Sequence, residues 1–471
     1  MIDTRPQDEA EAPSPATTGE EGEESYALPP ERVFAVREAI QREDRHGIAA
    51  LVGELFPADQ ADLLEALGHE DRATVVAALA GAFDPEVLPY LDATVREEVI
   101  ELLGPDRLAQ MLSDLDSDDA VYLFADLDEE AQSRILAKLP QAYRRLLVEG
   151  ATFEEGTAGR LMQREVVAIP SAWSVGETID FLRSADDLPD DFYDLYIVNP
   201  KHKPIGVIPT SRALRSKRPA KVSEVMDSER MKAVPLSMDQ AEVADLFRRY
   251  GLASAPVVDE AGRLVGVITV DDVVDVIDEE AEDDLLKLGG VSEGDLYRDV
   301  LQTTRARMPW LAVNLLTAIV ASIVIGFFES TLAQIVALAV LMPIVASMGG
   351  NAGTQTLTIA VRALAMKDLT SANARRIVGK EVIVGSINGL AFALVMGAIA
   401  WAWFDQPILG LVIGAAMIIN LVAAALSGIV IPLTLERMKI DPAIASTVFL
   451  TTVTDVVGFL AFLGLATLFL L

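Results

Sequence analysis

The chain contains no cysteine and only three histidines among its 471 residues. Disulfide bonds and thiolate metal sites are therefore excluded, and the redox compartment stays open. The histidines, His46, His69 and His202, all lie outside the long hydrophobic stretches, and no phosphate-binding loop is present. Nothing in this set resembles a hydrolase site, and we predict that the protein is not an enzyme.

Positive charge is scarce in the first part of the chain. Residues 301–471 hold nine Lys or Arg and seven Asp or Glu, so of the chain's 38 and 71, 29 and 64 fall in residues 1–300, a net charge of about −35 there. Such an acidic half argues against nucleic acid and anionic lipid as partners and favours cations as ligands. The first nine residues have no apolar core, so we expect no cleavable signal peptide and a cytoplasmic front half.

Five hydrophobic runs in the second half are each long enough to span a bilayer core of about 30 Å. They are Trp310–Phe328, Leu332–Val361, Val382–Phe404, Pro407–Leu435 and Ala443–Leu471. Lys and Arg lie before the first run, between the second and third, and between the fourth and fifth, whereas the other two connections carry only Glu329 and Asp405. Loops rich in Lys and Arg remain on the cytoplasmic side of a membrane. We therefore predict a multi-pass protein of the cytoplasmic (inner) membrane, with its N-terminus in the cytoplasm and its C-terminus outside.

One carboxylate, Asp455, lies inside the fifth run, with twelve residues before it from Ala443 and sixteen after it. Thr451 and Thr447 precede it at i−4 and i−8 and share its helical face. A charge at that depth costs on the order of 3 kcal/mol or more, so it usually faces a water-filled path or a partner. The alternatives are a structural ion pair and a permanently protonated acid. No Lys or Arg lies inside any hydrophobic run, and we predict an ion-pathway residue.

The second run contains a proline and three glycines between Met342 and Thr356. These residues predict a broken or kinked helix, because exposed backbone at membrane depth is tolerated only against protein or a water-filled cavity. The alternative is close helix packing through small residues. Asn351, Thr354 and Gln355 add polarity that packing does not require.

The front half divides into segments of different pattern. Residues 1–30 are rich in Glu, Pro, Ser, Thr and Gly and predict a disordered acidic tail. Residues 31–150 repeat short helix starts, such as Leu55-Phe-Pro-Ala-Asp, Leu103-Gly-Pro-Asp-Arg, Leu115-Asp-Ser-Asp-Asp and Leu127-Asp-Glu-Glu. Short helices at this spacing predict an all-α stacked superhelix.

An internal repeat of about sixty residues follows, over residues 151–220 and 221–279. Each copy has a Met-containing turn, Leu161-Met162 or Val225-Met226, and then two strands joined by a turn. The repeat resembles a tandem pair of cystathionine-β-synthase (CBS) domains, a βαββα regulatory module. In that family a Thr-x-x-Asp after the last strand can hold a nucleotide ribose. Thr269 and Asp272 fit this pattern in the second copy, which makes ATP a weakly supported ligand.

The segment after the second copy is strongly acidic. Residues 270–287 contain nine carboxylates and one cation, and we predict an acidic linking helix that leads over residues 280–300 to the membrane domain at 301–471. Asp271, Asp275 and Asp278 fall on one helical face, where like charges destabilise a helix by a few tenths of a kcal/mol per pair. Bridging divalent cations relieve that repulsion. The alternative is a solvated acidic helix that binds no cation.

The linked order of CBS pair, acidic helix, five spans, Gly-Gly-Asn-x-Gly-x-Gln and intramembrane Asp resembles the MgtE family of magnesium channels over about residues 30–471. The resemblance implies a homodimer in the bilayer whose spans form a central pore, with Asp455 of both chains facing a hydrated magnesium ion. Gly350, Asn351, Thr354 and Thr451 would line that pore; Thr354 stands where the family pattern leads us to expect Asn. The family's cytosolic magnesium sites would map onto Asp118, Asp272, Asp275, Glu280, Asp283, Asp284 and Asp441.

The function predicted on these grounds is a magnesium channel that cytosolic magnesium closes by bridging acidic domains. Mg²⁺ is then both the transported and the regulatory ion. A proton-coupled divalent cation transporter is the alternative, although Glu381, near one end of a run, is the single further titratable group in the membrane part that fits it. A membrane-anchored CBS sensor without transport is a third possibility, which the irregular second run disfavours.

Overall fold

The computed structural model describes residues 28–185, 188–189, 191–291, 300–370 and 373–471. The predicted tail over residues 1–30 therefore lies almost entirely outside the described residues, as do residues 292–299 of the predicted linking helix. The chain forms two compact units. One comprises residues 28–115 with Asp126–Leu139, and the other comprises Asp116–Ala125 with Pro140–Leu471; each is described by itself.

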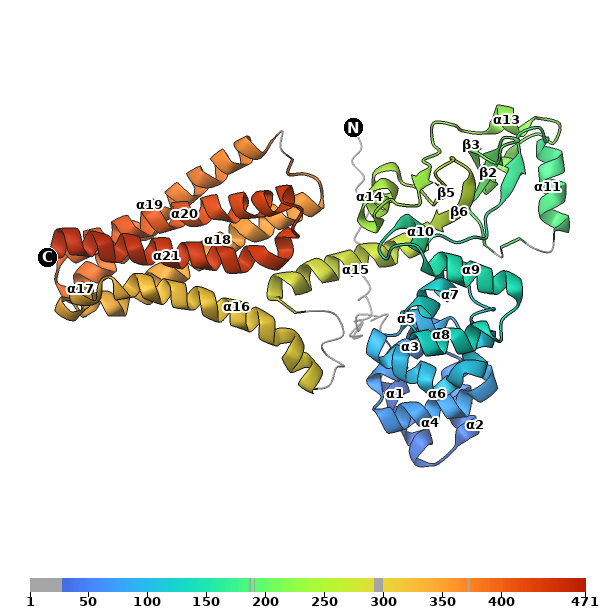
Figure 1. Ribbon diagram of the computed structural model, residues 1–471, viewed down its shortest axis with the longest axis horizontal. Coiled ribbons are helices and arrows are strands. Elements are labelled where there is room, and N and C mark those ends of the chain that lie inside the picture. The colour runs from blue at the N-terminus through green and yellow to red at the C-terminus, as the bar shows by residue number, and fades with distance from the viewer. Residues whose placement is uncertain (1–27, 186–187, 190, 292–299, 371–372) are drawn as a thin grey trace, which may run out of the picture. The chain divides into compact units, whose positions relative to one another are not determined.

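The first unit is helical, as predicted. Its helices are α1 (Pro30–Gln41), α2 (Arg45–Gly53), α3 (Pro57–Ala66), α4 (His69–Leu79), α5 (Val87–Tyr90), α6 (Ala93–Met111) and α8 (Glu129–Leu136) (Figure 1). The predicted starts are confirmed: Pro57 opens α3, and the Asp128 carboxylate accepts the N–H of Ala131 at 2.6 Å to cap α8. Gly104, at φ +75°, interrupts α6 just before Pro105. Only glycine adopts that backbone without strain, so a new helix begins there.

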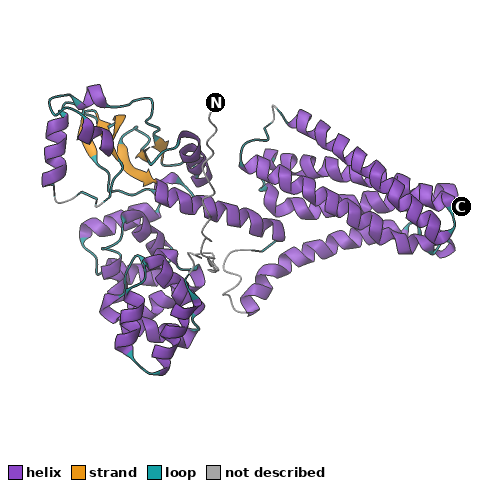
Figure 2. Ribbon diagram, turned by 180° about the vertical axis from the view of Figure 1, so that it is seen from behind, coloured by secondary structure: helices purple, strands orange, loops and turns teal. Residues whose placement is uncertain are grey.

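The second unit begins with three short helices, α7 (Ser117–Ala125), α9 (Gln141–Ala151) and α10 (Ala158–Leu161). Two small sheets follow, drawn in orange in Figure 2. Strands β1 (Ala168–Pro170), β2 (Asp194–Val198) and β3 (Pro204–Pro209) form the first sheet, and β4 (Val234–Pro235), β5 (Ser254–Val258) and β6 (Leu264–Thr269) form the second. In each sheet the first pair is parallel and the second pair antiparallel. The predicted repeat, with its turn at Asn199–Lys203, is confirmed.

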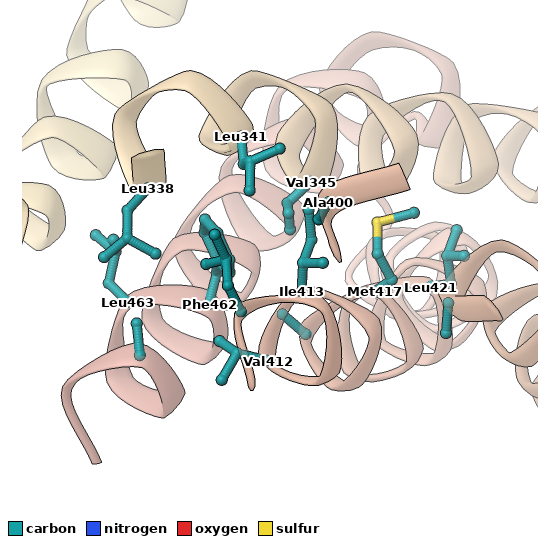
Figure 3. Close-up of a cluster of buried hydrophobic side chains, with 14 residues drawn as sticks. Leu338, Leu341, Val345, Ala400, Val412, Ile413, Met417, Leu421, Phe462 and Leu463 are labelled. Atoms are coloured by element: carbon teal, nitrogen blue, oxygen red, sulfur yellow. The ribbon is translucent and has the colours of Figure 1, made fainter. Parts of the chain in front are cut away.

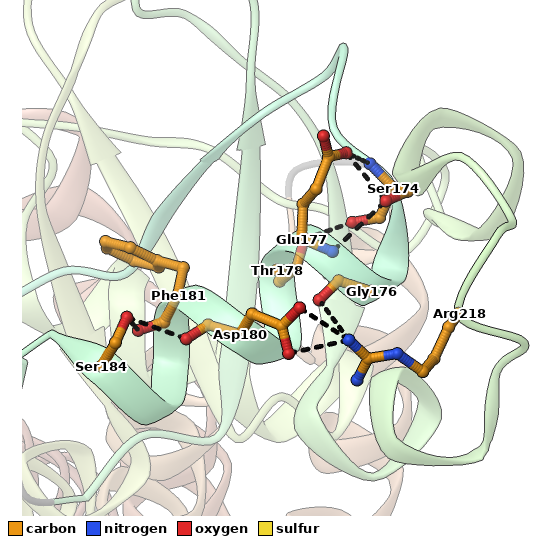
Figure 4. Close-up of polar contacts among 8 residues, drawn as sticks. All are labelled: Ser174, Gly176, Glu177, Thr178, Asp180, Phe181, Ser184 and Arg218. Carbon is orange, nitrogen blue, oxygen red and sulfur yellow. Dashed lines mark hydrogen bonds and ion pairs between the residues drawn. The ribbon is translucent and has the colours of Figure 1, made fainter.

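The helices of the repeats cover these sheets. They are α11 (Val175–Ser184), α12 (Thr210–Arg215), α13 (Val222–Val225) and α14 (Gln240–Tyr250). Ser174 and Glu177 form a capping box at the start of α11: the Ser174 N–H donates to Glu177 at 2.6 Å (Figure 4). Further along α11, the Arg218 guanidinium donates to both carboxylate oxygens of Asp180 at 2.6 and 2.7 Å. Local polar contacts thus set where this helix begins and how it lies.

The two repeats exchange their leading turns. Met162, in the turn at the start of the first repeat, packs against Gly266 of β6 in the second, and a Cβ at Gly266 would lie 2.8 Å from its sulfur. Met226, in the turn at the start of the second repeat, packs in the same way against Gly206 of β3 in the first, where a Cβ would lie 2.6 Å from its sulfur. Backbone hydrogen bonds of 2.8 to 3.1 Å fix both exchanges. The glycines are required because a side chain would displace the methionines.

The acidic helix is continuous with the second repeat. α15 runs from Val270 to Gly289, directly after β6, and Gly290 ends it in the left-handed conformation at φ +68°. Its apolar side, including Val273 and Val276, is buried against the second repeat, while Asp271, Asp275 and Asp278 are exposed. The predicted single face of carboxylates is therefore present.

Five of the described helices are long and apolar enough to cross a membrane, by length and composition. They are α16 (Val300–Gly326), α18 (Ala337–Ala365), α19 (Ala374–Phe404), α20 (Pro407–Arg437) and α21 (Pro442–Leu470), with the short α17 (Glu329–Gln334) before α18. α18, α20 and α21 run side by side (Figures 1 and 2). Leu338 and Val345 of α18 belong there to one buried cluster with Ile413 and Met417 of α20, which Figure 3 shows.

Of the predicted break or kink in the second span, the break is wrong. α18 is one continuous helix across Pro343 and all three glycines of the motif, none of which has a positive φ. Gly349 instead packs against Asn420 of α20, and a Cβ at Gly353 would lie 2.8 Å from Leu450 of α21. The alternative of close helix packing accounts for these two positions, whereas a Cβ at Gly350 would meet no atom within 4 Å. Gly349 and Gly353 therefore serve close approach by other helices, and α18 continues through both positions.

Candidate functional site

Asp455 lies on a polar stripe of α21. Thr451 is exposed, and Asp455 and Thr447 are partly exposed, so the predicted shared face is open in the single chain. The Thr451 hydroxyl donates its proton to the Thr447 carbonyl of the same helix at 2.9 Å, so its oxygen stays available as an acceptor. Among the residues that the structure describes, none donates a hydrogen bond to Asp455 or forms an ion pair with it. The alternative of a structural ion pair has no support in the described residues.

α18 carries a second polar stripe. Its exposed polar side chains follow helical spacing along one face: Ser347, Asn351, Thr354, Gln355 and Thr358. The Asn351 amide contacts the Ser347 hydroxyl at 3.4 Å, and the Thr354 hydroxyl donates to the Gly350 carbonyl at 2.9 Å. The opposite face, with Leu341 and Leu357, is buried. The predicted pore-lining residues Gly350, Asn351 and Thr354 all lie on or beside the open face, and their role stays a prediction.

Two candidate cytosolic ligands meet where α7 approaches the start of α15. Asp118 is buried, and its Oδ1 makes no hydrogen bond within the described structure. Burial, and then the charge of Asp272, raises the pKa of Asp118 well above its usual range. Burial also raises the pKa of Asp272 to about 6, although Thr269 opposes the shift by donating its hydroxyl to Asp272 Oδ2 at 2.7 Å. The buried Asp118 and the partly exposed Asp272 are thus near enough for the charge of one to shift the pKa of the other, an arrangement that a divalent cation stabilises.

Thr269 and Asp272, the predicted nucleotide-binding residues, form hydrogen bonds with each other. The Thr269 hydroxyl and N–H both point at the Asp272 carboxylate, which forms a capping box at the start of α15. A ribose would have to share or replace these bonds. ATP binding at these two residues stays a prediction.

The remaining candidate ligands lie further along α15. Burial, then the charges of Asp271 and Asp278, raises the pKa of Asp275. Glu280 accepts a hydrogen bond of 2.8 Å from Gln240 of α14. Glu280 and Asp441 line one cavity of about 610 Å³. The side chain of Asp284 lies outside the described part of the structure.

A lysine occupies the space between two of the predicted ligands. The Lys287 ammonium lies 2.5 Å from Asp283, one turn back on α15, and 2.9 Å from Asp441, which caps α21 by accepting the Ala443 N–H at 2.8 Å. Partial burial lowers the pKa of Lys287, but the two carboxylates outweigh this and raise it, so the ammonium stays charged. Lys287 was not among the predicted site residues, although it is the single cation among nine carboxylates over residues 270–287.

The described residues contain no group of three or more His, Asp or Glu side chains arranged to hold a metal ion. The exposed carboxylates of α15 instead form an open row along the helix. A cation on them therefore needs water or another protein surface to complete its shell, which suits magnesium because it keeps several waters.

Comparison with known proteins agrees with the predicted architecture. The sequence matches the MgtE intracellular N domain over residues 55–156, the CBS domain over 222–279, and MgtE, described as a divalent cation transporter, over 342–465. The magnesium transporter MgtE of Thermus thermophilus is 35% identical over 452 residues, 93% of this chain and 98% of that protein. Its counterpart in Bacillus subtilis is 29% identical over 423 residues, 89% and 93% of the two chains.

Among solved structures, the cytosolic domain of the Mg²⁺ channel MgtE in complex with ATP is 33% identical. It covers 52% of this chain and 99% of that chain, with a TM-score of 0.48. Because the sequence identity to the Thermus protein extends over nearly the full length of both chains, the chain belongs to the MgtE family of divalent cation transporters.

Proposed function

We propose that this protein conducts Mg²⁺ across the cytoplasmic membrane and that cytosolic Mg²⁺ closes it. The observation that carries the proposal is Asp455, a carboxylate in the middle of a membrane-spanning helix without a cationic partner among the described residues. An acid at that depth is expensive unless a cation or water faces it. The relatives from Thermus thermophilus and Bacillus subtilis, named magnesium transporters, support magnesium as that cation.

The polar stripes suit a hydrated ion. Mg²⁺ sheds its water reluctantly, so a site that recognises it in passage contacts the water shell through oxygen atoms. Asp455 provides the charge, and Thr451 provides an oxygen one turn away. Gly350, Asn351 and Thr354 extend the proposed path along α18.

A second copy of the chain completes the proposed pore. The stripes of α18 and α21 are exposed in the single chain, and polar side chains facing lipid are costly. A symmetric dimer that places Asp455 of both chains on one axis would bury these stripes around water.

The acidic helix is the proposed sensor. Asp118 with Asp272 forms one proposed magnesium site, and Asp275, Glu280, Asp283, Asp284 and Asp441 supply ligands for others. Without Mg²⁺ these carboxylates repel one another; with Mg²⁺ they are bridged, and α15 is held against the membrane helices. α15 is well placed for this, because its Lys287 already contacts Asp441 at the start of α21.

Single-channel recording tests the function. We expect discrete openings at low Mg²⁺ on the side of the N-terminal domains, and their disappearance when Mg²⁺ there rises to the millimolar range. Uptake without unitary currents, driven instead by a proton gradient, would favour the transporter over the channel. Absence of any flux would leave only the anchored sensor.

We propose that the N-terminus is cytoplasmic, because the basic loops all lie on its side of the spans. The chain has no cysteine, so single cysteines report cleanly. A cysteine at Met438, between α20 and α21, is expected to react with an impermeant thiol reagent from the cytoplasmic side only. One at Gln406, before α20, is expected to react from outside only. Reversed labelling would place the acidic helix outside the cell and contradict the sensor.

Lys287→Met is expected to lower the Mg²⁺ concentration that half-closes the channel by about tenfold, the equivalent of one charge-assisted hydrogen bond. The reason is competition: the ammonium now holds Asp283 and Asp441, and Mg²⁺ must displace it. Half-closing concentrations from recordings measure the change. Lys287→Arg is the control, because it keeps the charge and is expected to stay within about twofold of wild type. An unchanged or raised threshold in Lys287→Met contradicts the competition.

A further inference from the structure

An asparagine lies buried among the apolar side chains of α20. Asn420 is fully buried, and its sequence neighbours Met417 and Leu421 belong to the core cluster shown in Figure 3. Burying an amide in a membrane helix is unfavourable unless its polar atoms find partners. Such a residue therefore needs an explanation from its contacts.

Asn420 bridges the two helices that carry the polar stripes. Its Nδ2 donates to the Val345 carbonyl of α18 at 2.8 Å, while its Oδ1 has no partner in the described structure. The same amide packs directly on Gly349 of α18 and on Gly458 of α21, where an added Cβ would lie 2.7 Å from Nδ2.

The contacted residues stand next to the proposed pore. Gly349 immediately precedes Gly350 and Asn351, and Gly458 follows Asp455 by three residues, about one helical turn. Both glycines are buried, so the amide fills the gap between the helices from the side away from the open stripes. The hydrogen bond to α18 and the close contact with α21 together fix the distance between these two helices and their relative position along the helix axes.

We propose that Asn420 is a positioning residue for ion passage. It holds the turn of α18 that carries Gly350 and Asn351 at a fixed distance from the turn of α21 that carries Asp455. It does not touch the ion. A leucine has a similar size but cannot donate to the Val345 carbonyl, so it would fill the gap without fixing the height. This inference rests on the proposed function, since the two stripes matter as a pair only if they line one path.

A double-mutant cycle between Asn420 and Gly458 tests the inference in proteoliposomes, with the full chain. Gly458→Ala is expected to reduce Mg²⁺ flux at least about tenfold, because the new methyl group collides with the amide. In the Asn420→Ala background the methyl group enters the freed space, and the same substitution is expected to change flux by less than about twofold. Gly464→Ala, also on α21, is the matched control: its Cβ would meet only Phe328 at 4.0 Å, so no change is expected in either background.

Selectivity separates positioning from simple packing. Asn420→Leu is expected to keep the thermal unfolding midpoint within a few degrees of wild type but to lose about tenfold of the preference for Mg²⁺ over Ca²⁺ in flux. Equal damage from Gly458→Ala in both backgrounds, or wild-type selectivity in Asn420→Leu, would overturn the inference.

A second measurement separates this inference from the proposed function. In each variant, a single cysteine at Thr451 reports the water-exposed stripe through its rate of modification by an impermeant thiol reagent. If the wild-type protein carries no Mg²⁺, the proposed function fails. The structural part of the inference, that Asn420 sets the distance between α18 and α21, is still supported if Gly458→Ala changes the modification rate about tenfold when Asn420 is present and leaves it unchanged in the Asn420→Ala background. It falls if the two backgrounds respond alike.

Discussion

Asp455→Ala is expected to reduce Mg²⁺ uptake into proteoliposomes to the level of protein-free vesicles. The substitution removes the carboxylate that lies inside the fifth span, and with it the charge that makes the middle of the bilayer accessible to a cation. Asp455→Asn is expected to be milder, because an amide oxygen still faces the water shell but exerts no net attraction. Fluorescent Mg²⁺ indicators inside the vesicles measure both variants.

Asp405→Asn is the matched control for that experiment. Asp405 also lies in the membrane half, but it ends α19 in a left-handed conformation, which asparagine adopts readily. Its uptake is expected to equal that of wild type. Normal uptake by Asp455→Ala, in protein that inserts and dimerises normally, would refute the pore assignment.

Neutralising the sensor is expected to lock the channel open. In the triple variant Asp272→Asn, Asp275→Asn and Glu280→Gln, millimolar Mg²⁺ should no longer stop the current. The reason is the size of the effects: a gate that moves from mostly open to mostly closed needs roughly 5 kcal/mol of differential binding. Exposed like charges contribute only tenths of a kcal/mol per pair. Several bridging cations can supply the difference, whereas relief of repulsion cannot.

The acidic helix offers a control with the same loss of charge. Asp271, Asp278 and Glu282 are exposed and belong to none of the proposed sites. Asp271→Asn with Asp278→Asn and Glu282→Gln is expected to close with Mg²⁺ at close to the wild-type concentration. If the sensor variant instead stays shut without Mg²⁺, repulsion is the mechanism. If both triple variants behave alike, the carboxylates act only through their total charge.

Local sequence signals predicted most of the fold. Helix starts at Pro57 and Asp128, the strand turn at Asn199, and the five spans depend on capping residues, turn residues and hydrophobic length, all of which act within a few residues. Asp455 was likewise identifiable, because a lone carboxylate in an apolar run is conspicuous without any partner. These features require no knowledge of which segments meet.

The errors and omissions share one cause, the identity of a distant partner. The glycines of α18 look like helix breakers until Asn420 and Leu450, roughly 70 to 100 positions later, are seen to need the space. Lys287 looks like one charge among many until Asp441 of another helix lies beside it. The meeting of Asp118 with Asp272 likewise joins positions more than 150 residues apart. Residue type suggests what such groups can do, but only the fold shows what they face.

The exchange of methionines between the two repeats limits how this part of the chain can be recombined or engineered. Cutting the chain between the copies, near residue 220, would strip Met226 from Gly206 of the first copy and Met162 from Gly266 of the second. Each half would lose a backbone pairing as well as the methionine that packs on its glycine. A single copy is therefore not a transferable part. A domain graft, a truncation or a recombination event that keeps the module foldable has to move the pair together, from the turn before Met162 to the end of β6.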